Sequence, residues 1–152
     1  QAVVAAQRAI ELSPSFALGH LVLGMGELFR GAATAAIPAL ERGLSLNRYD
    51  PQNFIWYGLL SHAYLFVGRA DAAVKAALAA RTVRPAWRPI HRTLACCYTA
   101  LGEAQLAGQC IRRMRELDEP PGDALEPLGS RCPHWIDQLE ELLRKAQREE
   151  VR

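Results

Sequence analysis

Residues 51–84 read PQNFIWYGLLSHAYLFVGRADAAVKAALAARTVR, and residues 85–118 read PAWRPIHRTLACCYTALGEAQLAGQCIRRMRELD. The two stretches share one register with a period of 34 residues, which pairs Pro51 with Pro85, Leu60 with Leu94, Ala63 with Cys97, Tyr64 with Tyr98, Gly68 with Gly102 and Ala73 with Ala107. Self-similarity at such a period is typical of a helical solenoid, in which each unit packs against its neighbours. The functional question is therefore what the stacked surface holds.

Each unit reads as two helices joined by a turn. Over residues 54–67 the apolar positions recur with a period near 3.6, at Ile55, Leu59, Leu60, Ala63, Tyr64 and Val67. Gly68 is expected to end this helix because glycine tolerates a positive φ. A second helix is expected over residues 72–83, with Arg81 outside its apolar stripe and facing water, and Pro85 closes the unit.

Two looser copies precede this pair. Residues 15–50 align once three extra residues are placed in the turn at 47–50, and Glu27 then stands where Tyr64 stands in the next copy. Pro38 falls early in the second helix of this copy and should kink it or delay its start. Residues 1–14 match only the second helix of a further unit, so we expect the chain to be part of a larger protein.

The second full copy gives Tyr57, Leu60, Ser61, Tyr64, Gly68, Ala73, Ala80 and Pro85, and the third gives His91, Leu94, Ala95, Tyr98, Gly102, Ala107 and, where Ala is usual, Met114. This pattern resembles the tetratricopeptide repeat, or TPR, over roughly residues 1–118. The resemblance implies an all-α fold, a TPR-like right-handed solenoid of helix-turn-helix repeats. Its expected parts are a half repeat at 1–14 and full repeats at about 15–50, 51–84 and 85–118.

The tail has a different character. Residues 119–133 contain four prolines and two glycines and are expected to form a connector. Residues 134–152 are expected to form an amphipathic capping helix with i,i+4 pairs Glu140–Arg144 and Glu141–Lys145. Its apolar face carries Trp135, Ile136, Leu139, Leu142, Leu143 and Ala146. That face either docks in the groove of its own solenoid or packs against a second chain.

Composition narrows the choice of partner. The chain has 152 residues and a net charge of +2, with positive and negative residues mixed along its length. It has no basic stripe, so we expect no nucleic-acid partner. Arg112, Arg113 and Arg115 cluster in the last turns of a helix, where the helix dipole favours cations; the alternative is a contact with nucleic acid or phosphate. No apolar run is long enough to span a membrane, and no signal peptide is seen, so we expect a cytoplasmic protein.

The candidate chemical residues do not form a catalytic or metal site. The four cysteines, Cys96, Cys97, Cys110 and Cys132, lack CxxC or CxxH spacing, and Cys97 occupies the core position of Ala63; a Cys97–Cys110 disulfide is sterically conceivable. His20 and His91 share one repeat position, which indicates packing. His62 has either a partner-contacting or a plain surface role, and His134 is expected near the start of the last helix. We therefore expect no enzyme, metal or cofactor.

The first helices of TPR-like repeats line a concave groove, and the resemblance transfers that role by position. The groove set is Leu21, Met25, Leu28 and Phe29 from the first copy, Ile55, Gly58, His62, Leu65 and Phe66 from the second, and Arg92, Cys96 and Thr99 from the third. Apart from Arg92, the basic and amide side chains of a carboxylate clamp are absent. An apolar groove of this kind receives an amphipathic segment, is filled from within, or consists of core side chains.

A finer resemblance concerns the whole protein. Residues 50–73 and 133–146 resemble the C-terminal TPR-type regions of bacterial multidomain regulators, where such an array follows a class III nucleotide cyclase or a winged-helix DNA-binding domain. This implies a protein-interaction module in the regulatory or scaffolding part of a signalling protein. The alternative is a structural homodimerisation module whose groove or edge is the interface, and a remote alternative is an enzyme with an unrecognised site.

Overall fold

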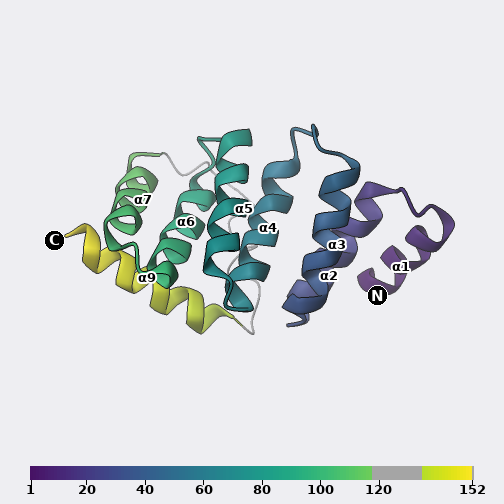
Figure 1. Ribbon diagram of the computed structural model, residues 1–152, viewed down its shortest axis with the longest axis horizontal. Coiled ribbons are helices and arrows are strands. Elements are labelled where there is room, and N and C mark those ends of the chain that lie inside the picture. The colour runs from purple at the N-terminus through teal and green to yellow at the C-terminus, as the bar shows by residue number, and fades with distance from the viewer. Residues whose placement is uncertain (118–134, 152) are drawn as a thin grey trace.

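The computed structural model describes residues 1–117 and 135–151, which leaves the predicted connector, Cys132 and His134 outside the described residues. Every regular element within those ranges is a helix: α1 (Ala2–Leu12), α2 (Ala17–Phe29), α3 (Ala33–Leu46), α4 (Asn53–Phe66), α5 (Ala70–Val83), α6 (Arg88–Leu101), α7 (Ala104–Glu116) and α9 (Ile136–Glu150). From α1 to α7 they follow one another along the long axis of the molecule (Figure 1).

Helices α2/α3, α4/α5 and α6/α7 are the three helix-turn-helix pairs, and each pair also packs on the next. The first helices contact one another as well, α2 with α4 and α4 with α6, so they form the inner layer of the stack. Helix α9 packs on α7 and α6 at the C-terminal end. The predicted all-α solenoid with a C-terminal capping helix is confirmed.

The turn inside each pair depends on a glycine. Gly31, Gly68 and Gly102 have φ of 89°, 81° and 87°, and no other type of residue has a positive φ among those described. A side chain at these positions would strain the left-handed backbone that reverses the chain. The repeat spacing identified the residues on which each hairpin turn depends.

Small side chains let the helices within a pair approach closely. Ala63 and Ala73 are fully buried between α4 and α5, and Leu60 and Tyr64 are 6% and 8% exposed beside them. The Ser61 hydroxyl donates a hydrogen bond of 2.8 Å to the carbonyl oxygen of Ala73. Ser61 thus fills the small-residue position and satisfies its own polar group by bonding across the helix pair.

The α2/α3 pair uses glycine instead of alanine at its closest contacts. A Cβ on Gly24 would lie 2.5 Å from Leu40 Cγ, and a Cβ on Gly43 would lie 2.5 Å from Leu21 Cγ. Each glycine therefore receives a leucine from the opposite helix. The absence of a side chain at Gly43 makes room for Leu21.

Pro38 and Glu27 are the two irregular positions of the α2/α3 pair. Helix α3 begins at Ala33, ahead of Pro38, so the proline lies inside the helix and does not delay its start. Glu27, where an aromatic residue was missing, is 6% exposed and forms an ion pair with Arg30 on the next turn. A buried carboxylate with one exposed cationic partner replaces the tyrosine that packs in the other repeats.

Candidate interaction surface on the inner face

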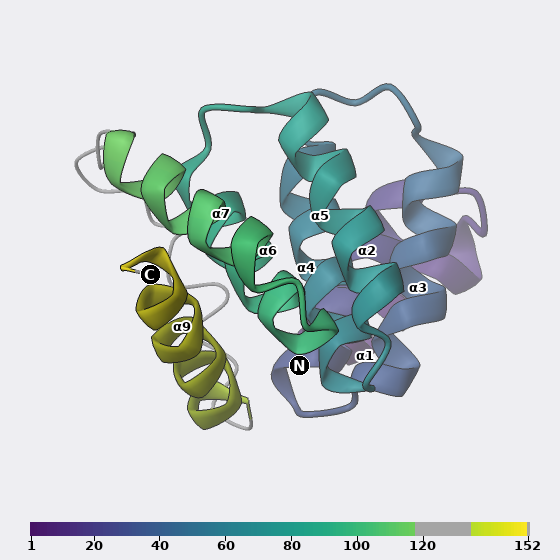
Figure 2. The same ribbon diagram turned by 60° about the vertical axis from the view of Figure 1, so that its left-hand side comes forward.

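The C-terminal helix lies on the inner layer of the solenoid as well as on its end. Helix α9 packs beside α6 and α7 (Figures 1 and 2), and the side chain of Trp135, the residue just before it, reaches Phe66 of α4. Trp135, Leu139, Leu142 and Leu143 all pack against the core cluster built from α2 to α6. The apolar stripe predicted for this helix is used within the chain, so the groove is filled in part from within.

Three stacked rings join α4 to the start of α9. The Phe66 and Trp135 rings are stacked with centroids 4.6 Å apart and planes 10° from parallel. The His62 ring is also stacked on Phe66, with centroids 5.9 Å apart and planes 11° from parallel. Stacks of this geometry add a favourable aromatic contact to the area they remove from water. Phe66, 8% exposed, is therefore the anchor for the first turn of α9.

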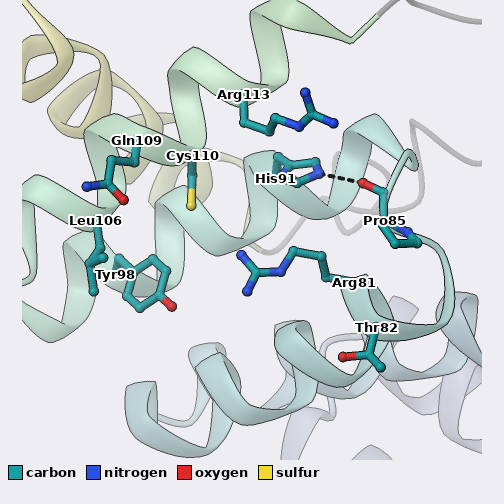
Figure 3. A pocket seen from close by; sticks show the side chains of 9 residues that line it. All are labelled: Arg81, Thr82, Pro85, His91, Tyr98, Leu106, Gln109, Cys110 and Arg113. Atoms are coloured by element: carbon teal, nitrogen blue, oxygen red, sulfur yellow. Dashed lines mark hydrogen bonds between the residues drawn. The ribbon is translucent and has the colours of Figure 1, made fainter.

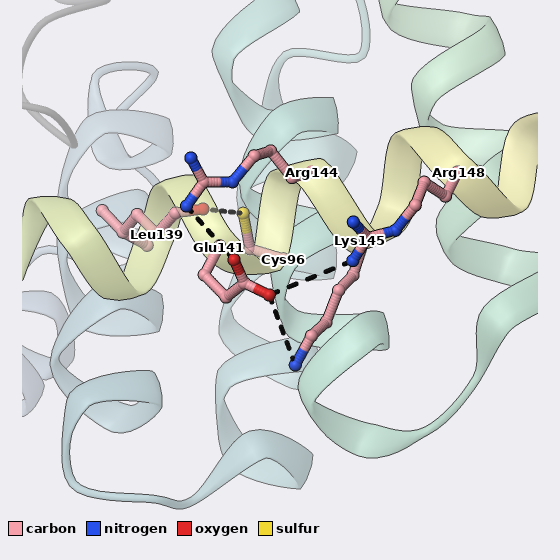
Figure 4. Close-up of polar contacts among 6 residues, drawn as sticks. All are labelled: Cys96, Leu139, Glu141, Arg144, Lys145 and Arg148. Carbon is pink, nitrogen blue, oxygen red and sulfur yellow. Dashed lines mark hydrogen bonds and ion pairs between the residues drawn. The ribbon is translucent and has the colours of Figure 1, made fainter.

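Further along the helix, a backbone contact ties α9 to α6. The Cys96 thiol lies 3.7 Å from the carbonyl oxygen of Leu139 and donates a weak hydrogen bond to it (Figure 4). Cys96 is 2% exposed, and burial raises the pKa of its thiol to about 12. A thiol held in its protonated form is a packing group and a weak donor.

The far end of α9 closes the last repeat. Ala146 is fully buried with Ala107, Cys110, Ile111 and Met114 in a second core cluster. A Cβ on Gly108 of α7 would lie 3.3 Å from the backbone of Glu150, so the two helices nearly touch there. Arg115 of α7 also forms an ion pair with Glu150. These contacts make α9 a cap over α7, which solenoids need at their last exposed face.

The outer side of α9 is charged and solvated. Glu141 is shared by Arg144 at 3.1 Å, Lys145 at 3.7 Å and Arg148 at 4.0 Å, with all four side chains about half exposed or more (Figure 4). The expected Glu141–Lys145 pair is present, whereas Arg144 pairs with Glu141 rather than with Glu140. Exposed pairs of this kind contribute little stability, and they keep this face in water.

Burial divides the predicted groove residues into three groups. Leu21, Leu28 and Leu65 are 3%, 0% and 2% exposed, which corrects their assignment, because core side chains cannot contact a partner on the surface. Phe66 and Cys96 contact α9, and Thr99 lines a shallow depression between α6 and α9 together with Lys145 and Arg148. Gly58 is buried, with Trp87 3.3 Å from the position of an added Cβ.

The third group remains partly accessible. Met25 and Phe29 on α2 and Ile55 on α4 are partly buried, and Leu18, on the first turn of α2, is 47% exposed. Helix α9 packs on α6 and α7 and leaves α2 aside. The inner face thus has a C-terminal half covered by α9 and an N-terminal half whose apolar side chains still reach the surface.

His62 is neither a surface residue nor an exposed contact, which corrects both readings of it. The side chain is 8% exposed, its Nε2 lies 3.3 Å from the Thr93 hydroxyl, and its Nδ1 has no hydrogen-bond partner. Burial first, and then Arg92, lower its pKa from 6.5 to about 4. His62 is therefore a neutral ring of α4, packed against Phe66 and α6.

His20 and His91 have the same structural role in different repeats, as their shared position predicted. His20 Nε2 lies 2.8 Å from the Pro14 carbonyl oxygen, and His91 Nε2 lies 2.8 Å from that of Pro85. Since a carbonyl can only accept, each ring donates its Nε2 proton. The histidine of the first helix thus fixes the proline that closes the preceding unit.

No arrangement for metal binding is found among the described residues, which contain no group of three or more His, Cys, Asp or Glu side chains placed to hold an ion. Cys96, Cys97 and Cys110 are free and buried. Within the described ranges, none of the helices has both the length and the apolar character needed to cross a bilayer.

Sequence reasoning missed two features of this surface. The Phe66–Trp135 stack joins residues far apart in the chain, and only the apolar stripe of the last helix hinted at it. The other is a hollow between α5, α6 and α7, where Arg81 of α5 and Arg113 of α7 line one pocket with Tyr98 of α6. Neither arginine belongs to an apolar stripe, so the apolar periodicity of the sequence could not predict that both line one pocket.

Solved structures share this architecture. A crystal structure of MamA matches with a TM-score of 0.71 and 20% identity over 98% of this chain and 86% of that one. A second crystal structure of MamA protein matches at 0.69 and 19% over 98% and 81%, and a MamA point mutant at 0.64 and 25% over 77% and 83%. No protein-family model and no curated protein matches the chain. The fold is TPR-like, while the finer resemblance to cyclase-linked or winged-helix regulators gains no support and stays a prediction.

Proposed function

We propose that this chain is a protein–protein interaction module whose inner face binds amphipathic helices. One observation carries the proposal: an amphipathic helix of the chain itself, α9, lies on that face with Trp135 stacked 4.6 Å from Phe66. A face that accepts one such helix has the shape and apolar chemistry for helix-in-groove recognition. The TPR-like fold is consistent with this, because stacked repeats form extended concave binding surfaces.

The partner is expected on the N-terminal half of the face, where Leu18, Met25, Phe29 and Ile55 retain accessible surface. Methionine adapts its shape to different apolar partners, which suits Met25 to this role. The charges of a carboxylate clamp are missing from these positions, so the partner segment is recognised by an apolar stripe. The regulatory role in a larger bacterial signalling protein, and the cytoplasmic location, rest on the sequence alone.

A photo-crosslinking experiment tests this proposal. A benzophenone amino acid is placed at Met25, and in a matched control at Arg42, an exposed residue of α3. We expect irradiation in cells that make the protein to give one discrete heteromeric product from position 25 and none from position 42. The same product should disappear when Leu18→Glu is added to the crosslinking chain. Equal products from both positions, or none from position 25, would refute the proposal.

A second candidate function is self-assembly, and a specific observation favours it. Large apolar side chains are exposed near the N-terminal end: Val4 is 68% exposed, Leu12 73% and Phe16 45%. Light scattering should then give twice the chain mass, and Leu12→Glu should restore the single mass. Leu142→Glu is unsuitable as a dimer probe, because Leu142 packs against the core of its own chain. A single mass over a wide concentration range would reject this candidate.

A further inference from the structure

A pocket opens between α5, α6 and α7, away from the inner face. It has a volume of about 640 Å³ and is lined by side chains from all three helices (Figure 3). Sites for small molecules usually have volumes of this size. One wall is fixed by His91, which is buried and donates its Nε2 proton to the carbonyl oxygen of Pro85 at 2.8 Å.

Two arginines line this pocket from different helices. Arg81 extends from α5 toward Tyr98 and Cys110, whereas Arg113 of α7 lies on the other side of the His91 ring with its guanidinium group turned away from that of Arg81 (Figure 3). Burial is the main cause of the lowered pKa of His91, and both Arg113 and Arg81 lower it further. Arg81 also opposes the rise in pKa that burial causes at Tyr98 and Cys110. Arg81 therefore acts electrostatically on three walls of the pocket.

The positive charge in the pocket is only partly compensated. Arg81 makes no ion pair with any of the described residues, and none of the lining residues is acidic. Arg113 forms an exposed pair with Glu116 at 3.1 Å, where the two side chains are 51% and 63% exposed. Such a pair is weak and exchanges readily for a stronger acceptor. Glu103 acts on Tyr98 as the last and smallest of its electrostatic influences.

The remaining lining supplies donors and one apolar wall. The Tyr98 hydroxyl and the Gln109 amide can donate hydrogen bonds, whereas the Thr82 hydroxyl already donates its proton to the Leu78 carbonyl at 2.9 Å. Leu106, 38% exposed, stands beside the Tyr98 ring (Figure 3). We propose that this pocket binds a small phosphate monoester, with the phosphate between Arg81 and Arg113 and its organic part against Leu106 and Tyr98.

Charge and geometry favour a phosphate over a carboxylate. A phosphate monoester carries close to two negative charges at neutral pH, which matches two guanidinium groups. Its three terminal oxygens can accept from both arginines and from a neutral donor at once, and arginine forks bind such oxygens in pairs. A carboxylate has half that charge and one oxygen fewer.

Titration calorimetry with phenyl phosphate and with inorganic phosphate tests the site. The variants are Arg81→Gln, Arg113→Gln and Leu106→Ser, with Arg42→Gln as a control that removes the same charge from the exposed side of α3. All four positions are exposed, so the folded state should tolerate the changes, and circular dichroism verifies this. We expect saturable binding of phenyl phosphate that Arg81→Gln and Arg113→Gln each weaken about 10-fold or more, while Arg42→Gln leaves it unchanged.

The apolar wall gives a second, independent readout. Phenyl phosphate should bind more tightly than inorganic phosphate, and Leu106→Ser should weaken only the phenyl compound. Loss of affinity in Arg42→Gln equal to that in Arg81→Gln would show a nonspecific charge effect and overturn the proposal. No saturable binding, or equal affinities for the two ligands in every variant, would overturn it as well. None of these outcomes depends on whether the inner face binds a partner.

Discussion

His62 should make the folded state sensitive to mild acid. Its ring is buried between Phe66 and the Thr93 hydroxyl, and burial, with a smaller effect of Arg92 on α6, lowers its pKa to about 4. In the unfolded chain the imidazole titrates near its ordinary value of 6.5. Between these values the unfolded chain binds a proton that the folded chain does not, so protonation favours unfolding.

The direction and size of the effect follow from these two values. The neutral ring contributes its full stability above pH 6.5, and this contribution is lost as the pH falls toward 4. The gap between 6.5 and about 4 corresponds to about 3 kcal/mol of unfolding free energy, of which about 2 kcal/mol is already lost at pH 5.

Urea unfolding of the wild type and of His62→Leu, at pH 7.5 and at pH 5, measures this loss. Leucine keeps an apolar contact with Phe66 and removes the titrating group, and Thr93 still donates to the Pro89 carbonyl at 3.2 Å. Between the two pH values the wild type should lose about 2 kcal/mol more than the variant. If the free-energy difference between the two proteins is the same at both pH values, His62 is not buried as a neutral ring and the reasoning fails.

Three other perturbations test the packing. Gly43→Ala should destabilise the protein by about 1–3 kcal/mol in a thermal melt, because the added Cβ meets a leucine of α2, although alanine favours a helix; a stabilised variant would contradict that contact. Trp135→Ala should cost about 2 kcal/mol and speed amide exchange in α9, whereas Trp135→Phe keeps the ring stacked on Phe66; equal exchange in both variants would show that the stack does not hold α9. The Cys96 and Cys97 thiols, each with a pKa raised to about 12 mainly by burial, should react with iodoacetamide at pH 8 only after unfolding, which mass spectrometry detects; rapid labelling of the native protein would rule out their burial.

The repeat pattern predicted those parts of the fold that depend on position within a unit. Gly68 and Gly102 both adopt a positive φ because each repeat must reverse at the same point, and Ala63 and Cys97 are both fully buried because they occupy the same helix contact. The pattern failed where a residue depends on neighbours outside its unit. His62 lies at a surface-type position of its repeat, and contacts with α6 and the Phe66–Trp135 stack bury it.

The sequence could not predict which segment occupies the groove, for a related reason. An apolar stripe on a helix predicts that the stripe is buried, but it does not predict which surface buries it. The stripe of α9 was therefore equally consistent with packing on its own solenoid and on a second chain. The choice is made by contacts that no periodicity encodes. At one end Gly108 admits the backbone of Glu150 within 3.3 Å of a would-be Cβ, and at the other Phe66 offers a ring to Trp135. With both ends of α9 held by its own chain, a partner helix would have to outcompete a tethered rival on the C-terminal half of the face. This competition is why the proposed partner site lies on the N-terminal half, around Met25.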